Sequence, residues 1–263
     1  MAARLITCNF VAGAADKVVK YQGFSATIID SFESPIDSLE GIAWNGQYMY
    51  TSSSSTEKVY KHDSFTPVIT DSFDYPVYYA RAIDWDGTNL LSSDTNAAAL
   101  IKHSGFSATI IDSFEAPGVG CASIEWDGTD LIVGDWDSGR VYKYAGFSST
   151  RVGFFAAPGD QIEGVAWDGT DLLSYDRPAE TFYKHKGFSK TILESFSAPV
   201  GNVKEMDWMI EPFTLWIVHY TGASATETKI TAIHFNTHDS NDCLLYTSPS
   251  PRDLSTSRMP SSA

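Results

Sequence analysis

The stretch GFSATIIDSFESP runs from Gly23 to Pro35, and GFSATIIDSFEAP runs from Gly105 to Pro117, 82 residues further on with one residue changed. Half of that interval is the period of the chain. A Gly-Phe or Ser-Phe pair, a tryptophan, a phenylalanine and a proline each recur every 41 residues; the tryptophans are Trp44, Trp85, Trp126, Trp167 and Trp208. A period of about 40 to 45 residues is typical of β-propeller blades and of helical repeat arrays.

Strand content decides between these two architectures. One repeat, from Gly164 to Phe196, contains the short runs GVAWDG, DLLSYD, TFYKH and KTILESF. Runs of this length that are rich in aromatic and β-branched residues and bounded by Gly, Pro, Asp or Ser indicate strands. The Asp-Gly or Asn-Gly pair after the first strand allows the positive φ of a tight hairpin. We therefore predict an all-β fold, a β-propeller of four-stranded antiparallel blades, with the strands of each blade named a to d in chain order.

The period also predicts where the blades lie within a propeller domain of residues 1–242. The first unit lacks its strand a and the last unit lacks its strand d, so we expect a six-bladed ring that is incomplete as sequenced. The expected blades are a partial first blade at 4–33, full blades at about 40–73, 81–114, 122–155 and 163–196, and a divergent last blade at 203–238.

Residues 243–263 belong to no repeat. The segments CLLYTSPSPRD and SRMPSSA match the translation of a transposase end, a primer site and a sequencing adapter, so we interpret them as a non-native, disordered tail on a truncated fragment from a sequencing assembly. A natural tail rich in Ser and Pro is the alternative interpretation.

Two phrases carry a resemblance to a known family. GVAWDGTDLLSYD (residues 164–176) and SIEWDGTDLIVGD (residues 123–135) resemble repeats of six-bladed propellers of the NHL and gluconolactonase-like type. The resemblance covers residues 5 to 208 and implies a fold without an activity, because propellers include binders, hydrolases, lyases and scaffolds. Gluconolactonase-like enzymes use a metal site, but the Asn and Glu of its ligand pattern have no counterparts that align in this chain.

Composition excludes several classes of partner. The formal charge is −15, with 33 acidic and 18 basic residues, so the surface repels phosphate backbones and anionic lipid. No run of about 18 apolar residues and no signal peptide is visible, which predicts a soluble protein without assigning a compartment. Three scattered cysteines do not make a disulfide framework or a zinc site.

Ligand-binding candidates come from the d-to-a and b-to-c loops, which open on one face and differ in every repeat. Aromatic rings there provide flat apolar platforms, and charges orient hydroxyl or amide groups, which suits a carbohydrate or a protein or peptide ligand. Packing between blades is the alternative role for the tyrosines. The candidates are Trp136, Tyr75, Tyr78, Tyr79, Arg81, Asp135, Asp137, Tyr175 and Arg177.

Carboxylates on the inner strands are weaker candidates for a metal site or for acid and base catalysis, with Ca²⁺ the possible cofactor. The alternative is ion pairing with Arg81 and Lys204. The candidates are Glu40, Asp84, Glu125, Glu163 and Asp207, together with Glu205. His62, His103 and His185 share one repeat position on three blades and are expected to diverge.

The leading functional hypothesis is a non-catalytic binding propeller. The alternatives are a metal-dependent hydrolase or lactonase that uses channel carboxylates, and a structural repeat module of a larger surface or phage-like protein.

Overall fold

A computed structural model describes residues 3–78, 80–210, 213–220, 228–235 and 246–247. The chain divides into two compact units, Ala2–Glu211 and Pro212–Ala263, with Met1 grouped with the second. The second unit contains an antiparallel sheet of β21 (Phe213–Tyr220), β22 (Thr228–Phe235) and β23 (Tyr246–Thr247). Apart from β23, the predicted adapter-derived tail lies outside the described residues.

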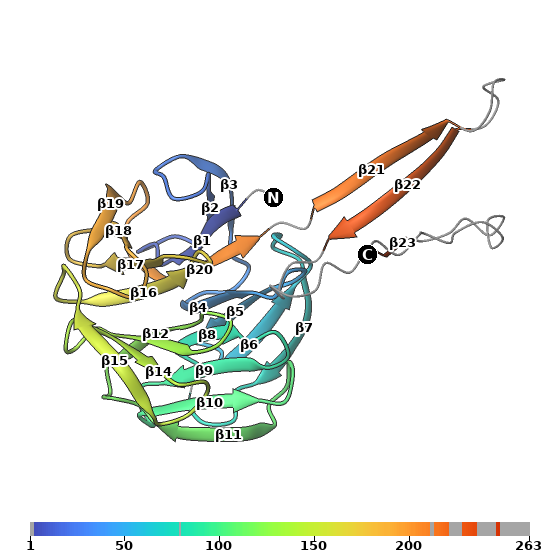
Figure 1. The fold of residues 1–263 in the computed structure, drawn as a ribbon. Coiled ribbons are helices and arrows are strands. Elements are labelled where there is room, and N and C mark those ends of the chain that lie inside the picture. The colour runs from blue at the N-terminus through green and yellow to red at the C-terminus, as the bar shows by residue number, and fades with distance from the viewer. Residues whose placement is uncertain (1–2, 79, 211–212, 221–227, 236–245, 248–263) are drawn as a thin grey trace, which may run out of the picture. The chain divides into compact units, whose positions relative to one another are not determined.

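The first unit is a β-propeller, and its described residues form five four-stranded antiparallel blades (Figure 1). Four blades are consecutive meanders, as the repeat predicts. Their strands are β4 (Leu39–Trp44), β5 (Met49–Ser53), β6 (Lys58–His62) and β7 (Ile69–Asp74); β8 (Ala82–Trp85), β9 (Leu90–Asp94), β10 (Ala99–His103) and β11 (Ile110–Glu115); β12 (Cys121–Trp126), β13 (Leu131–Asp135), β14 (Arg140–Tyr144) and β15 (Arg151–Ala156); and β16 (Ile162–Trp167), β17 (Leu172–Asp176), β18 (Thr181–His185) and β19 (Ile192–Ser197).

The remaining blade joins the two ends of the propeller, and with it the described residues form five blades where the repeat predicted six with a gap. Its strand order is β20-β1-β2-β3, with β20 at Val203–Ile210, β1 at Ala3–Asn9, β2 at Lys17–Tyr21 and β3 at Ile28–Glu33. We expected the segment from residue 203 to open a sixth blade. Instead, β20 pairs antiparallel with β1 and supplies the missing strand a, because the inner edge of β1 otherwise has unsatisfied backbone groups. The described residues of the ring therefore form five blades.

Aromatic pairs repeat around the ring and show the same closure. In every blade the phenylalanine of strand d packs edge-on against the Gly-Phe or Ser-Phe phenylalanine of the next blade, with ring centroids 4.8–5.3 Å apart. Such T-shaped contacts stabilise beyond the area they bury. The fifth pair, Phe196 with Phe24, joins the last blade to the first. The recurrent phenylalanines therefore pack between blades.

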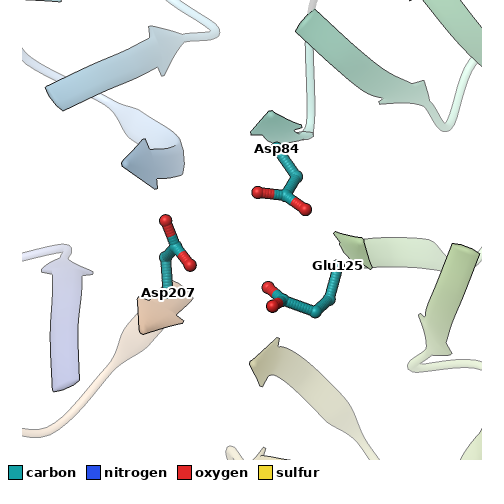
Figure 2. A group of neighbouring side chains, drawn as sticks. All are labelled: Asp84, Glu125 and Asp207. Atoms are coloured by element: carbon teal, nitrogen blue, oxygen red, sulfur yellow. The ribbon is translucent and has the colours of Figure 1, made fainter. Parts of the chain in front are cut away.

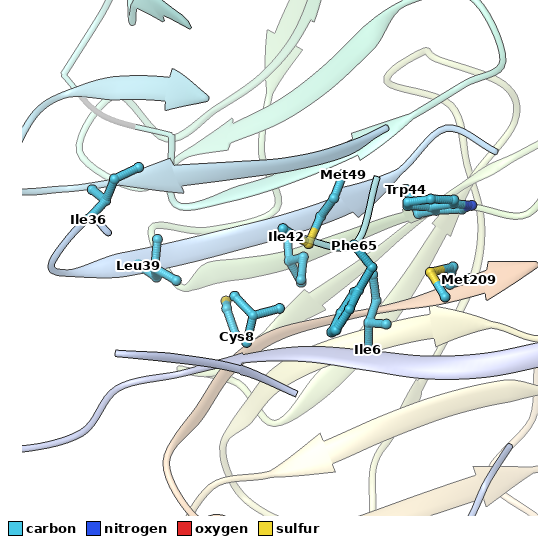
Figure 3. Close-up of a cluster of buried hydrophobic side chains, with 10 residues drawn as sticks. Ile6, Cys8, Ile36, Leu39, Ile42, Trp44, Met49, Phe65 and Met209 are labelled. Carbon is cyan, nitrogen blue, oxygen red and sulfur yellow. The ribbon is translucent and has the colours of Figure 1, made fainter. Parts of the chain in front are cut away.

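The core lies in layers between neighbouring blades. In one layer, Ile6 and Cys8 from β1 meet Leu39, Ile42 and Met49 from β4 and β5, all at most 1% exposed (Figure 3). Turns between strands a and b keep the layers in register: the glycines of the Asn-Gly and Asp-Gly pairs have φ of 94–97°, which only glycine adopts readily. This scaffold places five inner strands around the centre of the ring.

Candidate functional site

The inner strands β4, β8, β12, β16 and β20 contact one another in sequence around the ring. One aligned position, directly before the recurrent tryptophan, carries a carboxylate in three blades and an alanine in the other two. The five residues are Ala43, Asp84, Glu125, Ala166 and Asp207. The small alanines leave the shared space to the three acids.

Asp84, Glu125 and Asp207, named here the channel carboxylates, converge from β8, β12 and β20. One oxygen of each lies within 4.8 Å of the others, and each residue is only 5% exposed. Figure 2 shows the three side chains pointing toward one another. The cluster thus combines Asp84 and Glu125, from neighbouring blades, with Asp207, which ring closure brings beside them.

Each channel carboxylate also accepts a hydrogen bond from the backbone of the next blade. The donors are the N–H groups of Trp126 to Asp84, Trp167 to Glu125 at 2.9 Å, and Trp44 to Asp207 at 2.5 Å. An inner strand has no neighbouring strand on the side that faces the centre of the ring. Its backbone N–H groups on that side find no partner within the sheet, and these carboxylates accept their hydrogen bonds. The carboxylates are therefore held in place from one side.

Electrostatics make this cluster costly in its fully ionised form. Burial, and then the charge of Asp207, raises the pKa of Asp84 well above its ordinary value. Burial, followed by the charges of Asp84 and Asp207, does the same to the pKa of Glu125. Burial raises the pKa of Asp207 to about 7. Three carboxylates in this space need either protons or a cation.

Glu205 adds a fourth acid, two residues before Asp207 on β20. It is fully buried, and its Oε1 accepts a hydrogen bond from the hydroxyl of Ser123 at 2.7 Å. Burial raises the pKa of Glu205 well above its usual range. Oε2 of Glu205 and Oε2 of Glu125 are both buried and accept no hydrogen bond from the described residues. Buried oxygens without partners are rare in folded proteins and indicate room for a ligand or a proton.

The other two metal candidates belong to a separate ion-pair network. Arg81 pairs through Nη1 with Glu40 and through Nη2 with Glu163. Arg177 approaches Glu163 to 3.1 Å, and Lys204 approaches Glu40 to 3.9 Å. Glu40 and Glu163 therefore do not join the channel carboxylates. They form ion pairs instead, Glu40 with Arg81 and Lys204, and Glu163 with Arg81 and Arg177.

The ligand candidates divide by exposure. Tyr75 is 6% exposed with its hydroxyl 2.8 Å from that of Ser92, and Tyr175 is fully buried with its ring 4.9 Å from that of Phe182. Neither ring is available as a platform, because each packs in a hydrophobic core cluster between blades. Asp135 is also buried and accepts a hydrogen bond from the Ser138 hydroxyl at 2.8 Å across the b-to-c turn.

Four candidates remain accessible on that face. Tyr78 is 57% exposed, Trp136 is half-buried, and Asp137 and Arg177 are exposed. Arg81 is 8% exposed and committed to its ion pairs, and Tyr79 lies outside the described residues.

Two exposed valines were missed by the sequence interpretation. Val77 is 38% exposed beside Tyr78, and Val119 is 58% exposed at the repeat position that matches Tyr78 in the next blade. Comparing equivalent loop positions at the 41-residue spacing would have revealed this pair.

The three aligned histidines do not form a site. His62, His103 and His185 are at most 1% exposed, and Nε2 of each lies 2.8–2.9 Å from a threonine or serine hydroxyl on the neighbouring strand. Burial lowers the pKa of each to about 4.

Comparison with known proteins supports the fold and leaves the function open. No protein-family model and no curated protein sequence matches the chain. Among solved structures, Myxococcus xanthus glutaminyl cyclase has a TM-score of 0.51 at 15% identity, with 70% of this chain and 83% of that chain covered. A chain of the mitotic checkpoint complex has a TM-score of 0.48 at 14% identity, with 73% of this chain covered; this chain spans 64% of its length. The NHL and gluconolactonase-like resemblance finds no family match.

The described residues contain no helix of the length and apolar character needed to cross a membrane.

Proposed function

We propose that this chain is a binding propeller that recognises a protein or carbohydrate ligand on the face formed by its d-to-a and b-to-c loops. The single observation that carries this proposal is the exposure of Val77, Tyr78 and Val119 on two successive d-to-a loops of that face. The other strongly exposed large hydrophobic residues lie mainly on the outer strands d, where they repeat in every blade. Apolar side chains exposed on irregular loops are typical of recognition surfaces.

The residues around these side chains suit a polypeptide surface. Tyr78 presents a rigid amphipathic ring, and Trp136 presents part of an indole from the b-to-c turn of the blade that follows the Val119 loop. Exposed Asp137 and Arg177 add charges of both signs. Aromatic anchors within an apolar patch and a polar surround make up the usual anatomy of an interaction site. The aliphatic valines favour a protein or peptide over a sugar, which binds mainly to aromatic faces.

The experiment screens the purified chain against a random peptide library and a glycan array, and then measures the affinity of the best ligand for three variants. Tyr78→Ala and Trp136→Ala remove the loop-face rings. Ile111→Ala, which truncates a 53% exposed side chain on β11, is the matched control away from that face.

Removal of an interface anchor costs about 2 kcal/mol or more, so we expect Tyr78→Ala to weaken binding at least about thirtyfold, with Ile111→Ala unchanged. Selection of a glycan by the array would identify the carbohydrate class on the same face. A ligand whose affinity is insensitive to both ring variants, or the absence of any ligand from both screens, would contradict the proposal.

A further inference from the structure

The channel carboxylates provide a second site that the loop-face proposal does not use. We propose that Asp84, Glu125 and Asp207 hold one Ca²⁺ ion, which ties β8, β12 and β20 together inside the ring. Two observations carry this inference: the convergence of three carboxylates, and the buried Oε2 of Glu125, which accepts no hydrogen bond from the described residues. Figure 2 shows the Glu125 carboxylate turned toward the other two. Oε2 of fully buried Glu205 also accepts no hydrogen bond from the described residues, but Glu205 is not one of the three clustered residues.

The donor set selects the class of ion. All three ligands are carboxylate oxygens, which are the donors that hard cations such as Ca²⁺ and Mg²⁺ prefer over soft ones. Points that lie within 4.8 Å of one another have a centre at most about 2.8 Å from each of them. Calcium binds oxygen at about 2.3–2.6 Å, which falls within this limit, whereas magnesium dehydrates reluctantly and is seldom held by protein carboxylates alone, so the buried donor set favours calcium.

Burial indicates a structural ion and not a catalytic one. A hydrolase must bring a substrate to its metal, and each of these residues is 95% buried; an ion needs far less room. The site is formed only when the ring is closed, because Asp207 lies on β20, which pairs with β1, whereas Asp84 and Glu125 lie on consecutive blades in the middle of the chain. An ion bound there favours the closed ring over any state in which β20 has left it. Proton sharing among the three carboxyls is the competing way to relieve their repulsion.

The test uses the full chain, freed of metal with a chelator and then titrated with CaCl₂ or MgCl₂. Isothermal calorimetry gives the stoichiometry, and tryptophan fluorescence follows thermal unfolding. Glu125→Gln keeps the shape and the acceptor for the Trp167 N–H but removes the charge. Asp112→Asn is the control, because it neutralises an exposed acid on β11.

We expect one Ca²⁺ per chain, tighter than Mg²⁺, and a rise in Tm of about 5–10 °C at a concentration 100-fold above Kd. Glu125→Gln should weaken calcium binding at least tenfold and remove the shift, with Asp112→Asn like the parent protein.

Three results would overturn the proposal: no calcium-dependent heat or shift at 5 mM, unchanged affinity in Glu125→Gln, or an equal loss in Asp112→Asn, which would mean surface binding. Should Glu125→Gln fail to fold, Asp207→Asn with terbium luminescence excited through tryptophan provides the same comparison. Terbium emission from the parent that Asp207→Asn leaves unchanged would also count against the site.

Discussion

The three buried histidines make the stability of this propeller depend on pH, and His185 allows the effect to be isolated. Its Nδ1 lies 3.0 Å from the carbonyl oxygen of Ser189 and therefore donates, so its Nε2 accepts from the Ser174 hydroxyl at 2.8 Å. Both ring nitrogens are satisfied in the neutral form. Burial lowers the pKa of His185 from 6.5 to about 4, opposed by the hydrogen bond to Ser189.

The sign follows from proton linkage. The unfolded chain binds a proton at this histidine near pH 6.5, and the folded chain does so only near pH 4. The contribution to stability is therefore complete above pH 6.5 and is lost as the pH falls toward 4. At about 1.4 kcal/mol per pH unit, acidification from pH 7.5 to pH 4.5 removes about 2.5 kcal/mol for this one side chain.

The assay is urea unfolding at a series of pH values, for the parent chain and for His185→Asn, whose amide nitrogen replaces Nδ1. The difference in unfolding free energy between the two should shrink by about 2.5 kcal/mol between pH 7.5 and pH 4.5. The buried carboxyl groups change the unfolding free energy with pH in the opposite direction. Subtracting the curve of the variant from that of the parent chain cancels this contribution, because both chains contain these groups. Leu173→Ala, a buried truncation in the same blade, is the control whose deficit should not change with pH. A His185→Asn deficit that is equally constant would refute the reasoning, since it would mean that the imidazole titrates alike in both states.

Two pairs of substitutions test the ion-pair network and the packing of inner strands. Arg81→Met removes the buried cation beside Glu163, which is only 2% exposed, and leaves it paired with the exposed Arg177, so it should cost about 3–5 kcal/mol in urea unfolding. Arg177→Ala removes the exposed partner of the same carboxylate and should cost less than about 1 kcal/mol. Equal losses of stability in Arg81→Met and Arg177→Ala would contradict this reasoning. Gly41→Ala would place its Cβ 2.9 Å from the backbone nitrogen of Ile83 and 2.7 Å from the Ser52 hydroxyl, and should cost about 1–3 kcal/mol. Gly164→Ala meets the flexible Met206 side chain first, at 3.0 Å, so thermal unfolding should show a smaller loss; the reverse order would refute the packing argument.

The repeat predicted four of the blades well because each of these is a local meander. Strand order, hairpin positions and the in-register aromatic residues all follow from contacts within 41 residues or between neighbouring units. The number of blades is different, because it depends on whether two distant segments pair. Val203–Ile210 fits equally well as the first strand of a new blade and as the missing strand of the first one, and the pairing of β20 with β1 distinguishes these.

The residues of the candidate site were likewise predicted only in part. The sequence pointed to Asp84, Glu125 and Asp207 together with Glu40 and Glu163, although the two groups occupy different repeat positions. Sorting the acids by position would have separated them, since one position is followed by the recurrent tryptophan and the other also contains Arg81 and Lys204. Exposure was harder to predict: Tyr75 and Tyr175 lie in or beside variable loops, yet both rings are buried between blades.

Hydrogen exchange at β1 tests the closed five-bladed ring most directly. In the structure β1 is paired with β20 along Ala3–Asn9 and with β2 along Ile6–Asn9, so the backbone amides of Ile6–Asn9 have a neighbouring strand on both sides. We predict slow exchange along Ile6–Asn9 of β1, comparable with β5, β9, β13 and β17, the second strands of the other blades. Fast exchange at alternate residues of β1, as expected for a strand whose inner edge faces water, would contradict ring closure and with it the assembly of the channel carboxylates.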